Sequence, residues 1–382
     1  MNERIRVATI IQAFYPHVGG AERQLAALAP LLQARGANIF VLTRRYPGLR
    51  PFEMVNDVPV YRLPIPGPKA VKSMSFTLSA MPLLRRLRPD VIHAHELLSP
   101  TTTAVTAKRL FGTPVVTKVL RGGTLGDVYK LKNRRFGRSR LERFKQQVDA
   151  FIAISREIDT ELAEVGIAAK KRTFIPNGVD TGRFTPLSTT EKMAKKRELV
   201  LPPGQHILFT GRLVPEKRID QLITSWPAIR KVHANANLLV LGAGPEAARL
   251  EQLAGPGVHF LGQLDNVADF LQAADLFVLP SATEGLSNAL LEAMASGLAC
   301  IATRVGGATD VITHRQNGWL LQPDEPAQLQ EAINTLLADV ASRTRLGEQA
   351  RLKMLREYAL PMVADRLLLL YRSLLMDRPY IN

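Results

Sequence analysis

The chain has 382 residues, of which 46% are apolar, and it carries 50 Lys and Arg against 34 Asp and Glu, a net charge of +16. This length favours two domains with ordinary globular cores, and no unbroken apolar run reaches the roughly 18 residues of a membrane span. The single cysteine, Cys300, excludes an internal disulfide. Because the N-terminus passes directly into an apolar strand without a signal-peptide pattern, we expect a cytoplasmic protein.

Short apolar runs alternate with helical segments along the chain, which predicts parallel sheets with helices on both faces. The first set of predicted strands is residues 5–11, 38–43, 90–94, 113–118, 150–155 and 173–176. A segment rich in Gly, Pro, Ser and Thr, typical of a linker, then begins at residue 177. The second set of strands is 206–210, 237–241, 259–261, 276–279, 300–303 and 318–321. We predict an α/β fold of two doubly wound, Rossmann-like domains, 1–184 and 185–360, followed by an apolar helix at 361–376.

The most informative segment follows the predicted strand at 276–279. The strand ends at a polar turn carrying Glu284 and Gly285, after which strong helix formers run to a stop at Gly297. In an open α/β sheet this junction faces the ligand crevice beyond the carboxyl ends of the strands. Glu292 lies two helical turns further on, so the two carboxylates would hold different parts of one long ligand such as a nucleotide sugar. Taken alone, Glu284 and Glu292 also fit a helix with a solvated carboxylate at each end.

In each predicted domain, the loop after the opening strand carries candidate phosphate-binding residues. Gly19 and Gly20 precede a helix, where they let backbone N–H groups approach a phosphate, although a tight turn without ligand uses the same residues. Arg212 and Lys217 follow the strand at 206–210. A guanidinium fork and an ammonium at a strand end suit a diphosphate and neutralise the charge of a leaving group. Exposed loop charges would give the same pattern.

A histidine pair ends the strand at 90–94. His95 follows the apolar part of this strand, and His93 lies on the same strand face because side chains alternate with a period of two. A lone strand histidine is more often structural than catalytic. His95 is therefore a candidate only together with the motifs above.

A competing fingerprint follows the strand at 237–241. Gly242 and Gly244 fit the Gly-x-Gly-x-x-Ala pattern of dinucleotide sites. However, Pro245 donates no backbone N–H, and no residues suited to hydride transfer accompany it. The chain also lacks Asp-x-Asp, CxxC and HExxH patterns. We therefore expect no cofactor and no metal.

These motifs together resemble the family 4 retaining glycosyltransferases, also called glycosyl transferases group 1, and the resemblance runs from end to end of the chain. It implies the GT-B fold, in which two Rossmann-like domains face each other across a cleft. Domain 1–184 would bind the acceptor, domain 185–360 would bind the nucleotide sugar, and the C-terminal segment 361–382 would pack back on the first domain. The implied reaction transfers a sugar, with UDP-hexose or UDP-N-acetylhexosamine favoured, to a glycan or lipid-linked acceptor of cell-surface polysaccharide or glycolipid synthesis.

The resemblance also implies roles for the candidate residues. His95 would lie near the reacting carbon of the donor sugar, Arg212 and Lys217 would stabilise the departing diphosphate, and Glu284 would fix sugar hydroxyls. Family members are described as letting the leaving phosphate take the acceptor proton, so no general base is assigned. The implied donor-binding residues are Gly19, Gly20, Gly242, Leu261, Gly285, Leu286, Ser287, Asn288 and Glu292. Alternatives on the same architecture are a sugar-nucleotide epimerase, a phosphorylase or a non-catalytic nucleotide-sugar-binding protein.

The positive charge concentrates between Lys118 and Lys145, with ten basic residues and two acidic ones. Such a surface favours an anionic partner. Few aromatic residues are present for base stacking and no nucleic-acid-binding signature appears, so nucleic acid is not expected. Anionic lipid head groups or a lipid-diphosphate acceptor fit better, which would place the protein peripherally on the inner face of the cytoplasmic membrane. A merely solvated basic face is the alternative.

Overall fold

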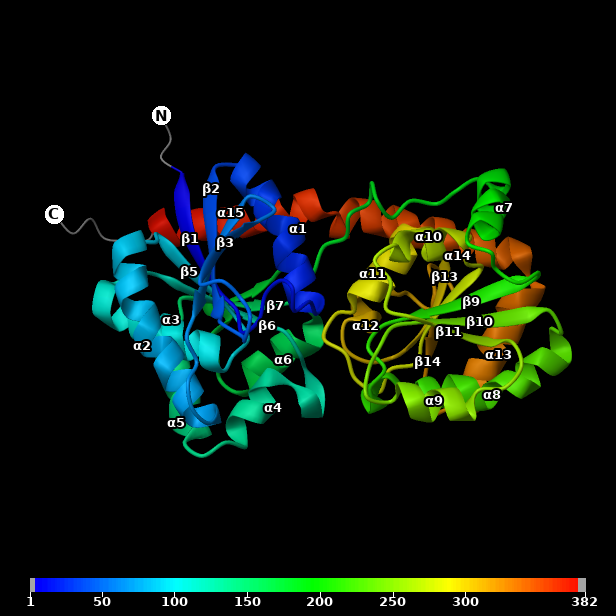
Figure 1. The fold of residues 1–382 in the computed structure, drawn as a ribbon, viewed down its shortest axis with the longest axis horizontal. Helices are drawn as coiled ribbons and strands as arrows, with labels where there is room; N and C mark the ends of the chain where they lie inside the picture. Colours follow the sequence, from blue (N-terminus) through cyan, green and yellow to red (C-terminus); the bar gives the residue numbers. More distant parts are fainter. Residues whose placement is uncertain (1–3, 377–382) are drawn as a thin grey trace. The chain divides into compact units, whose positions relative to one another are not determined.

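The computed structural model describes residues 4–376, and Figure 1 labels most of their helices and strands. Two compact units divide the chain: one contains residues up to Asn177 together with those from Leu360, and the other is Gly178–Ala359. This division falls earlier than the expected boundary at residue 184. The reason is local packing, because the guanidinium of Arg351 donates hydrogen bonds to the carbonyls of Thr181 at 2.9 Å and Phe184 at 2.5 Å, which ties this stretch to the second unit.

The first unit is built on an eight-stranded sheet with the order β3-β4-β2-β1-β5-β6-β7-β8. All neighbouring pairs are parallel except β3 with β4, so the prediction of a purely parallel sheet was wrong at this edge. The strands are β1 (Ile5–Ile10), β2 (Ala37–Arg44), β3 (Phe52–Val55), β4 (Val58–Leu63), β5 (Val91–His95), β6 (Val115–Val119), β7 (Ala150–Ala153) and β8 (Arg172–Phe174).

The unpredicted strands β3 and β4 form a hairpin. Asn56 and Asp57 connect them with φ angles of 48° and 60°, the left-handed conformation that two-residue hairpin turns require. Val58 and Val60 are buried and alternate with partly exposed residues. The alternation of buried and partly exposed residues in β4 and the Asn56-Asp57 turn are therefore sequence signals that indicate this hairpin.

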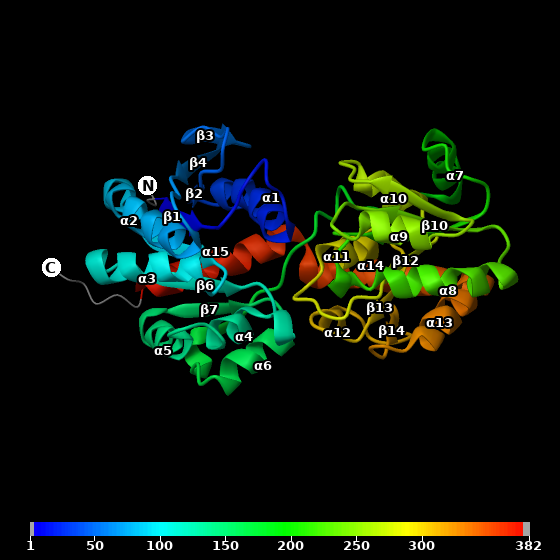
Figure 2. The same cartoon turned by 60° about the horizontal axis from the view of Figure 1, so that its bottom comes forward.

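Helices cover both faces of this sheet. They are α1 (Gly20–Ala34), α2 (Lys69–Leu87), α3 (Ser99–Phe111), α4 (Asp127–Lys132), α5 (Gly137–Gln147), α6 (Arg156–Glu164) and α15 (Leu360–Met376). Helix α15 lies beside α1 and shares one hydrophobic core with it (Figure 2). Because parallel crossovers are right-handed, α2, α3, α5 and α6 cover the opposite face. The remainder of the predicted segment 361–382, residues 377–382, lies outside the described residues.

The second unit contains a six-stranded sheet in which every neighbouring pair is parallel, as predicted. Its order is β11-β10-β9-β12-β13-β14. The strands are β9 (Gln205–Thr210), β10 (Ala236–Leu241), β11 (Val258–Gly262), β12 (Leu276–Leu279), β13 (Ala299–Thr303) and β14 (Trp319–Leu321). The helices are α7 (Thr189–Glu198), α8 (Ile219–Val232), α9 (Ala247–Leu253), α10 (Val267–Ala273), α11 (Asn288–Ala295), α12 (Ala308–Val311), α13 (Pro326–Ala338) and α14 (Val340–Lys353).

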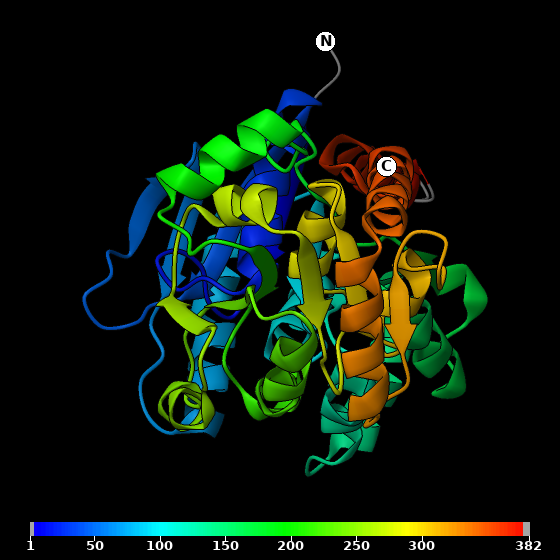
Figure 3. The ribbon, with the colours of Figure 1, turned by 90° about the vertical axis from the view of Figure 1, so that its right-hand side faces the viewer.

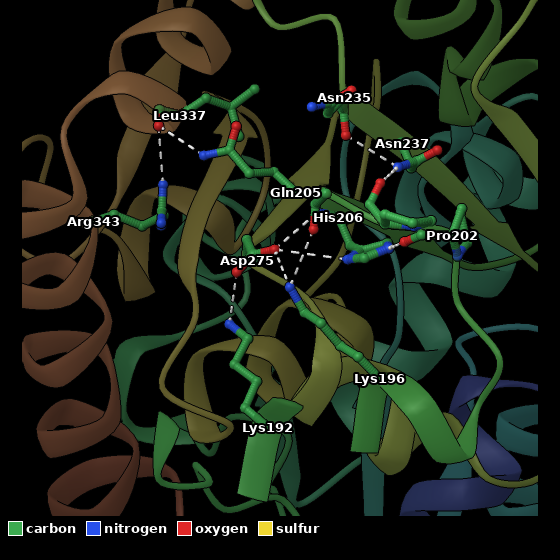
Figure 4. A network of polar contacts seen from close by, with 12 residues as sticks. Lys192, Lys196, Pro202, Gln205, His206, Asn235, Asn237, Asp275, Leu337 and Arg343 are labelled. Carbon is green, nitrogen blue, oxygen red and sulfur yellow. Dashed lines mark hydrogen bonds and ion pairs between the residues drawn. The ribbon is translucent and has the colours of Figure 1, made fainter. Parts of the chain in front are cut away.

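Helix α7, within the segment predicted to be a linker, lies beside α10 in the second unit (Figure 3). Figure 4 shows the polar network that anchors it. The carboxylate of Asp275 forms ion pairs with Lys192 at 2.9 Å and Lys196 at 2.8 Å, and it accepts a 2.8 Å hydrogen bond from the backbone N–H of His206. Burial alone would raise the pKa of Asp275, but the contacts with His206 and the two lysines hold it well below its usual range.

Candidate active site

In the second unit, the loop after β9 carries Arg212 and Lys217. The guanidinium of Arg212 is exposed and has no ion pair or hydrogen bond with any side chain of residues 4–376. Lys217 ends a short 3₁₀ turn, Pro215–Lys217, and its ammonium forms an ion pair with Glu284 in which the two side chains are only 17% and 11% exposed. Arg212 is therefore available to an anion, whereas Lys217 is already paired with Glu284.

The loop after β12 holds Glu284, as the strand-turn-helix pattern predicted. Its carboxylate accepts a second hydrogen bond, of 2.7 Å, from the hydroxyl of Ser281. The backbone N–H of Ala282 donates to the carbonyl of Glu216 at 2.8 Å, so the loops after the neighbouring strands β9 and β12 are joined by backbone as well as side-chain contacts. These contacts bring together Lys217 and Glu284, which are 67 residues apart in the chain.

Helix α11 follows this loop directly. Ser287 caps it by accepting a hydrogen bond from the N–H of Leu290, and Asn288 is its first residue. Within the loop Gly285 and Leu286 are buried, whereas Glu292 is half-buried on the second turn of the helix. Gly297 has a φ of 72°, which ends the helix where the sequence predicted it. The N-terminal end of α11 thus follows Glu284 closely in the chain.

Sequence reasoning missed two glycines that support the Glu284 loop. Gly306 and Gly307 follow β13, and the N–H of Gly307 donates to the carbonyl of Gly285 at 2.6 Å. Gly306 has a φ of 52°, and a Cβ atom there would lie 2.2 Å from the carbonyl oxygen of Glu284. Adjacent glycines directly after a buried strand were the signal that could have found them.

The Gly-x-Gly pattern after β10 has a packing explanation. Gly242 has a φ of 147°, and a Cβ atom on it would lie 1.8 Å from the carbonyl oxygen of Gly211. A Cβ atom on Gly244 would lie 2.1 Å from the carbonyl oxygen of Leu213. Both glycines therefore allow the backbone after β10 to lie against the Arg212 loop. Leu261, another predicted donor contact, is half-buried in the edge strand β11.

In the first unit, Gly19 and Gly20 form the start of α1. Gly19 is the N-cap, and its N–H donates a 2.9 Å hydrogen bond to the carboxylate of Glu22. Burial raises the pKa of Glu22, although the backbone hydrogen bonds oppose this shift. An anion that approaches this loop would therefore meet a carboxylate already bound to one of its donors.

His95 is the last residue of β5 and is buried next to His93, with 4.5 Å between ring centroids. His93 is in turn hydrogen-bonded through Nδ1 to the hydroxyl of Tyr371 on α15 at 2.7 Å. Neither ring nitrogen of His95 has a partner within residues 4–376. Burial lowers the pKa of His95 well below its usual value and that of His93 to about 3. His95 is therefore a neutral ring with unused hydrogen-bonding capacity.

Lys118 pairs with His95 in the register of β5 and β6. Sequence analysis placed Lys118 at the start of a basic surface, but this residue is only 4% exposed, because it sits at the end of a central strand. Its ammonium donates a 2.9 Å hydrogen bond to the side chain of Asn177, and burial lowers the pKa of Lys118 to about 8. The basic surface therefore begins after this residue.

Glu96, which follows His95, was not singled out in the sequence. It has a φ of 90°, which is strained for a non-glycine residue, and its carboxylate is hydrogen-bonded to the side chain of Gln12. Burial and the neighbouring Asp127 raise its pKa. A strained acidic residue at the carboxyl end of β5 adds a polar group to the His95 region.

The second unit thus collects cations, a carboxylate and helical N–H groups at the carboxyl ends of adjacent strands. An exposed guanidinium and a nearby ammonium can bind a diphosphate, and a carboxylate can accept hydrogen bonds from sugar hydroxyls. Within residues 4–376, no group of three or more His, Cys, Asp or Glu side chains is arranged to hold a metal ion.

Family models and known proteins match this chain. The family model for Glycosyltransferase Family 4 matches residues 18–183, and that for Glycosyl transferases group 1 matches residues 204–339. The GDP-mannose-dependent alpha-mannosyltransferase of Mycobacterium tuberculosis is 30% identical over 381 residues, with 95% of each chain covered. The N-acetyl-alpha-D-glucosaminyl L-malate synthase of Bacillus anthracis is 28% identical over 383 residues, which are 95% of this chain and 96% of the relative.

Among solved structures, Anabaena Alr3699/HepE in complex with UDP-glucose has a TM-score of 0.81 at 18% identity, covering 97% of this chain and 100% of that one. The fold is accordingly GT-B, and the enzyme is a glycosyltransferase of polysaccharide, glycolipid or glycogen-type synthesis. These relatives give no support to the epimerase, phosphorylase or binding-protein alternatives. The chain belongs to glycosyltransferase family 4, the glycosyl transferases group 1.

Proposed function

We propose that this enzyme is a retaining transferase that moves a sugar from a nucleotide-diphosphate sugar to a glycan or lipid-linked acceptor of cell-surface polysaccharide or glycolipid synthesis. The observation that carries the proposal is the exposed, unpaired Arg212 beside the Lys217–Glu284 ion pair. A UDP-hexose or UDP-N-acetylhexosamine is the favoured donor. One relative is named for an N-acetylglucosaminyl product and one solved neighbour contains UDP-glucose, whereas another relative is named for GDP-mannose.

Negative charge grows on the diphosphate as its bond to the sugar breaks. Arg212 and Lys217 would stabilise this charge in the transition state, and the N–H groups of the Gly19-Gly20 loop would add to them. Because two side-chain cations already supply positive charge, we propose a reaction that needs no metal ion and no other cofactor.

The transferred sugar would be held by polar groups of both units. Glu284 would accept hydrogen bonds from its hydroxyls, and the neutral ring of His95 would bind a hydroxyl close to the reacting carbon. Glu292 would bind the ribose of the nucleotide. Gly242, Leu261, Gly285, Leu286, Ser287 and Asn288 would complete the donor contacts. The leaving phosphate would take the acceptor proton, so no side chain acts as the general base.

The acceptor side of the proposal rests on the first unit. Lys132 at the end of α4 and Arg134 and Arg135 in the turn before α5 are exposed, and the adjacent Phe136 is 69% exposed. We propose that this surface, residues 121–145, contacts an anionic membrane or a lipid-diphosphate acceptor, with the enzyme bound peripherally. Across residues 4–376 the structure contains no helix with the length and apolar character needed to cross a membrane.

The decisive experiment is a thermal-shift screen of the full chain against UDP-, GDP- and ADP-sugars, since a specific donor raises the unfolding temperature by mass action. The best donor is then incubated with and without glycan and lipid-linked acceptors, and the products are identified by mass spectrometry, with the anomeric configuration read by NMR. Transfer with retention is the expected result. Isomerised donor without acceptor, phosphorolysis, inverted products or no turnover with any stabilising donor would each contradict the proposal.

A further inference from the structure

A cavity of about 310 Å³ lies in the first unit between helices α3 and α5. Its lining comes from α3, between Thr102 and Leu110, and from α5, between Arg140 and Phe144, and it shares no residue with the proposed transfer site.

Three arginines line this cavity: Arg109 from α3, and Arg140 and Arg143 from α5. The guanidinium of Arg140 donates hydrogen bonds to neutral oxygens only, the hydroxyl of Thr102 at 2.7 Å and the carbonyl of Leu98 at 3.2 Å. The guanidinium groups of Arg109 and Arg143 have no side-chain partner in the described part of the chain. All three positive charges therefore lack a carboxylate there.

Nearby acids cannot supply the missing charge, because they are paired elsewhere. Asp149 forms its ion pair with Lys108 at 2.5 Å, and Glu142 with Lys145 at 2.6 Å. Burial, together with the positive charges of Arg134 and Arg143, lowers the pKa of Arg140. An anion in the cavity would relieve this crowding of like charges.

The remaining walls are apolar. Val105 and the ring of Phe144 are buried at 2% and 1% exposure, while Leu110 is 61% exposed. The guanidinium of Arg140 lies 5.6 Å from the centre of the Phe144 ring, so no aromatic face is left open for a nucleotide base to stack on. Apolar walls with a cationic lining suit a ligand that is itself part anionic and part apolar.

We propose that this cavity binds the phosphate head of a phospholipid, with Arg109 and Arg143 on the phosphate and the start of the acyl chains against Leu110. Guanidinium groups suit this role because they bind phosphate oxygens through two parallel hydrogen bonds. This inference rests on the proposed membrane contact of residues 121–145, to which Arg140 and Arg143 belong, and deepens it. The cavity would let the first unit recognise one class of lipid head group, in addition to any general attraction to a charged surface.

The test is isothermal titration calorimetry of the full chain with dihexanoyl phosphatidic acid, a lipid short enough to stay in solution, so that no membrane and no sugar transfer is involved. Inorganic phosphate and dihexanoylglycerol are titrated in parallel. We expect the lipid phosphate to bind more tightly than either one. Arg109→Gln and Arg143→Gln should each raise its Kd by about tenfold or more, since each removes a charged hydrogen-bond donor.

A third variant, Thr106→Glu, places a carboxylate on α3 within the arginine-lined cavity. It should abolish binding without lowering the unfolding temperature, because glutamate favours helix and would pair with the arginines. Arg372→Gln on α15, an exposed arginine on the opposite face of the sheet, is the matched control and should bind as the wild type does. The proposal fails if inorganic phosphate or dihexanoylglycerol binds as tightly as the lipid phosphate, or if the cavity variants keep the wild-type Kd.

Discussion

Lys217 and Glu284 form an ion pair between the loops that follow the adjacent strands β9 and β12. The hydroxyl of Ser281 binds the same carboxylate oxygen of Glu284 at 2.7 Å. A diphosphate that binds Lys217 must share its ammonium with this carboxylate, which leaves Glu284 positioned next to the sugar attached to that diphosphate. The pair thus couples the proposed phosphate-binding group to the proposed sugar-binding group.

Replacing either cation should slow the reaction. Arg212→Ala and Lys217→Ala should each lower turnover by roughly 10²-fold, because both groups act on charge that develops in the transition state. Arg212→Ala should keep its stability to within about 0.5 kcal/mol, since its side chain has no partner among the described residues. Lys217→Ala should lose about 1–3 kcal/mol, because Glu284 would keep a nearly buried carboxylate without its cation. Lys231→Ala, an exposed site on α8, is the control.

Steady-state kinetics measures the effect on turnover, and urea unfolding measures the effect on stability. Unchanged turnover in both well-folded variants would remove Arg212 and Lys217 from the proposed mechanism.

The glycine at the end of β10 should matter for structural reasons. Gly242→Ala should lower the free energy of unfolding by about 2 kcal/mol or more, because its Cβ atom would lie 1.8 Å from the carbonyl oxygen of Gly211 at a φ of 147°. Donor affinity should fall with it, since the displaced backbone carries Arg212. Gly255→Ala is the matched control, because nothing lies within 4 Å of its added Cβ atom. Equal urea midpoints for the two variants would show that the close approach has no energetic consequence.

Buried Lys118 should give the protein a specific pH dependence. Burial lowers its pKa from 10.5 to about 8, so between these values the unfolded chain binds more protons than the folded chain. The free energy of unfolding should therefore gain up to roughly 3 kcal/mol from this residue as pH rises from about 8 to 10.5. Below pH 8 both states are charged and the gain is absent.

Lys118→Met should remove this part of the slope, which urea unfolding at several pH values measures. Lys132→Met, an exposed lysine of the same unit, should keep the slope. The neighbouring His93, His95, Tyr371 and Asn177 are present in both variants, so the difference reports Lys118 alone. Parallel curves for wild type and Lys118→Met would contradict the assignment.

Local sequence patterns predicted much of this molecule. The strand at 276–279, the turn at Glu284 and the helix stop at Gly297 all follow from residues close together in the chain. The alternation of strands and helices likewise indicated both sheets, because most strands here are short apolar runs. The features that the sequence did not predict depend mostly on contacts between residues far apart in the chain.

The ion pair between Lys217 and Glu284 joins positions 67 residues apart, and no local pattern specifies such a contact. The same limitation explains why Lys118 was expected on the surface. Its charge is evident from the sequence, but its burial at the end of a central strand is not. The hairpin of β3 and β4 is different, because its Asn56-Asp57 turn is a local signal.

The proposed reaction should survive removal of divalent metal. EDTA should leave turnover essentially unchanged, because Arg212 and Lys217 would supply the positive charge that a bridging cation provides in metal-dependent enzymes. Turnover is measured with the donor found in the thermal-shift screen, in buffers of equal ionic strength. Complete loss of activity that only Mg²⁺ or Mn²⁺ restores would overturn the metal-independent proposal.

The exposed basic surface between α4 and α5 should bind anionic membranes. Association with liposomes should strengthen with the fraction of anionic lipid and weaken as salt rises, since both changes act on the same screened attraction. Neutralising Lys130, Lys132, Arg134 and Arg135 together should remove several kcal/mol of this attraction, at about 1 kcal/mol per charge. Co-sedimentation with vesicles measures the effect. Donor affinity should not change, because the proposed donor cations belong to the second unit.

A matched control separates the position of the charges from their number. It neutralises four exposed cations elsewhere on the protein, namely Arg197, Lys231, Arg345 and Arg372. This control loses the same net charge, so it should bind vesicles much more tightly than the α4–α5 variant if the surface is the contact. If wild type ignores anionic vesicles at low salt, or if the two variants bind equally, these residues form only a solvated face, and a soluble glycan becomes the better acceptor.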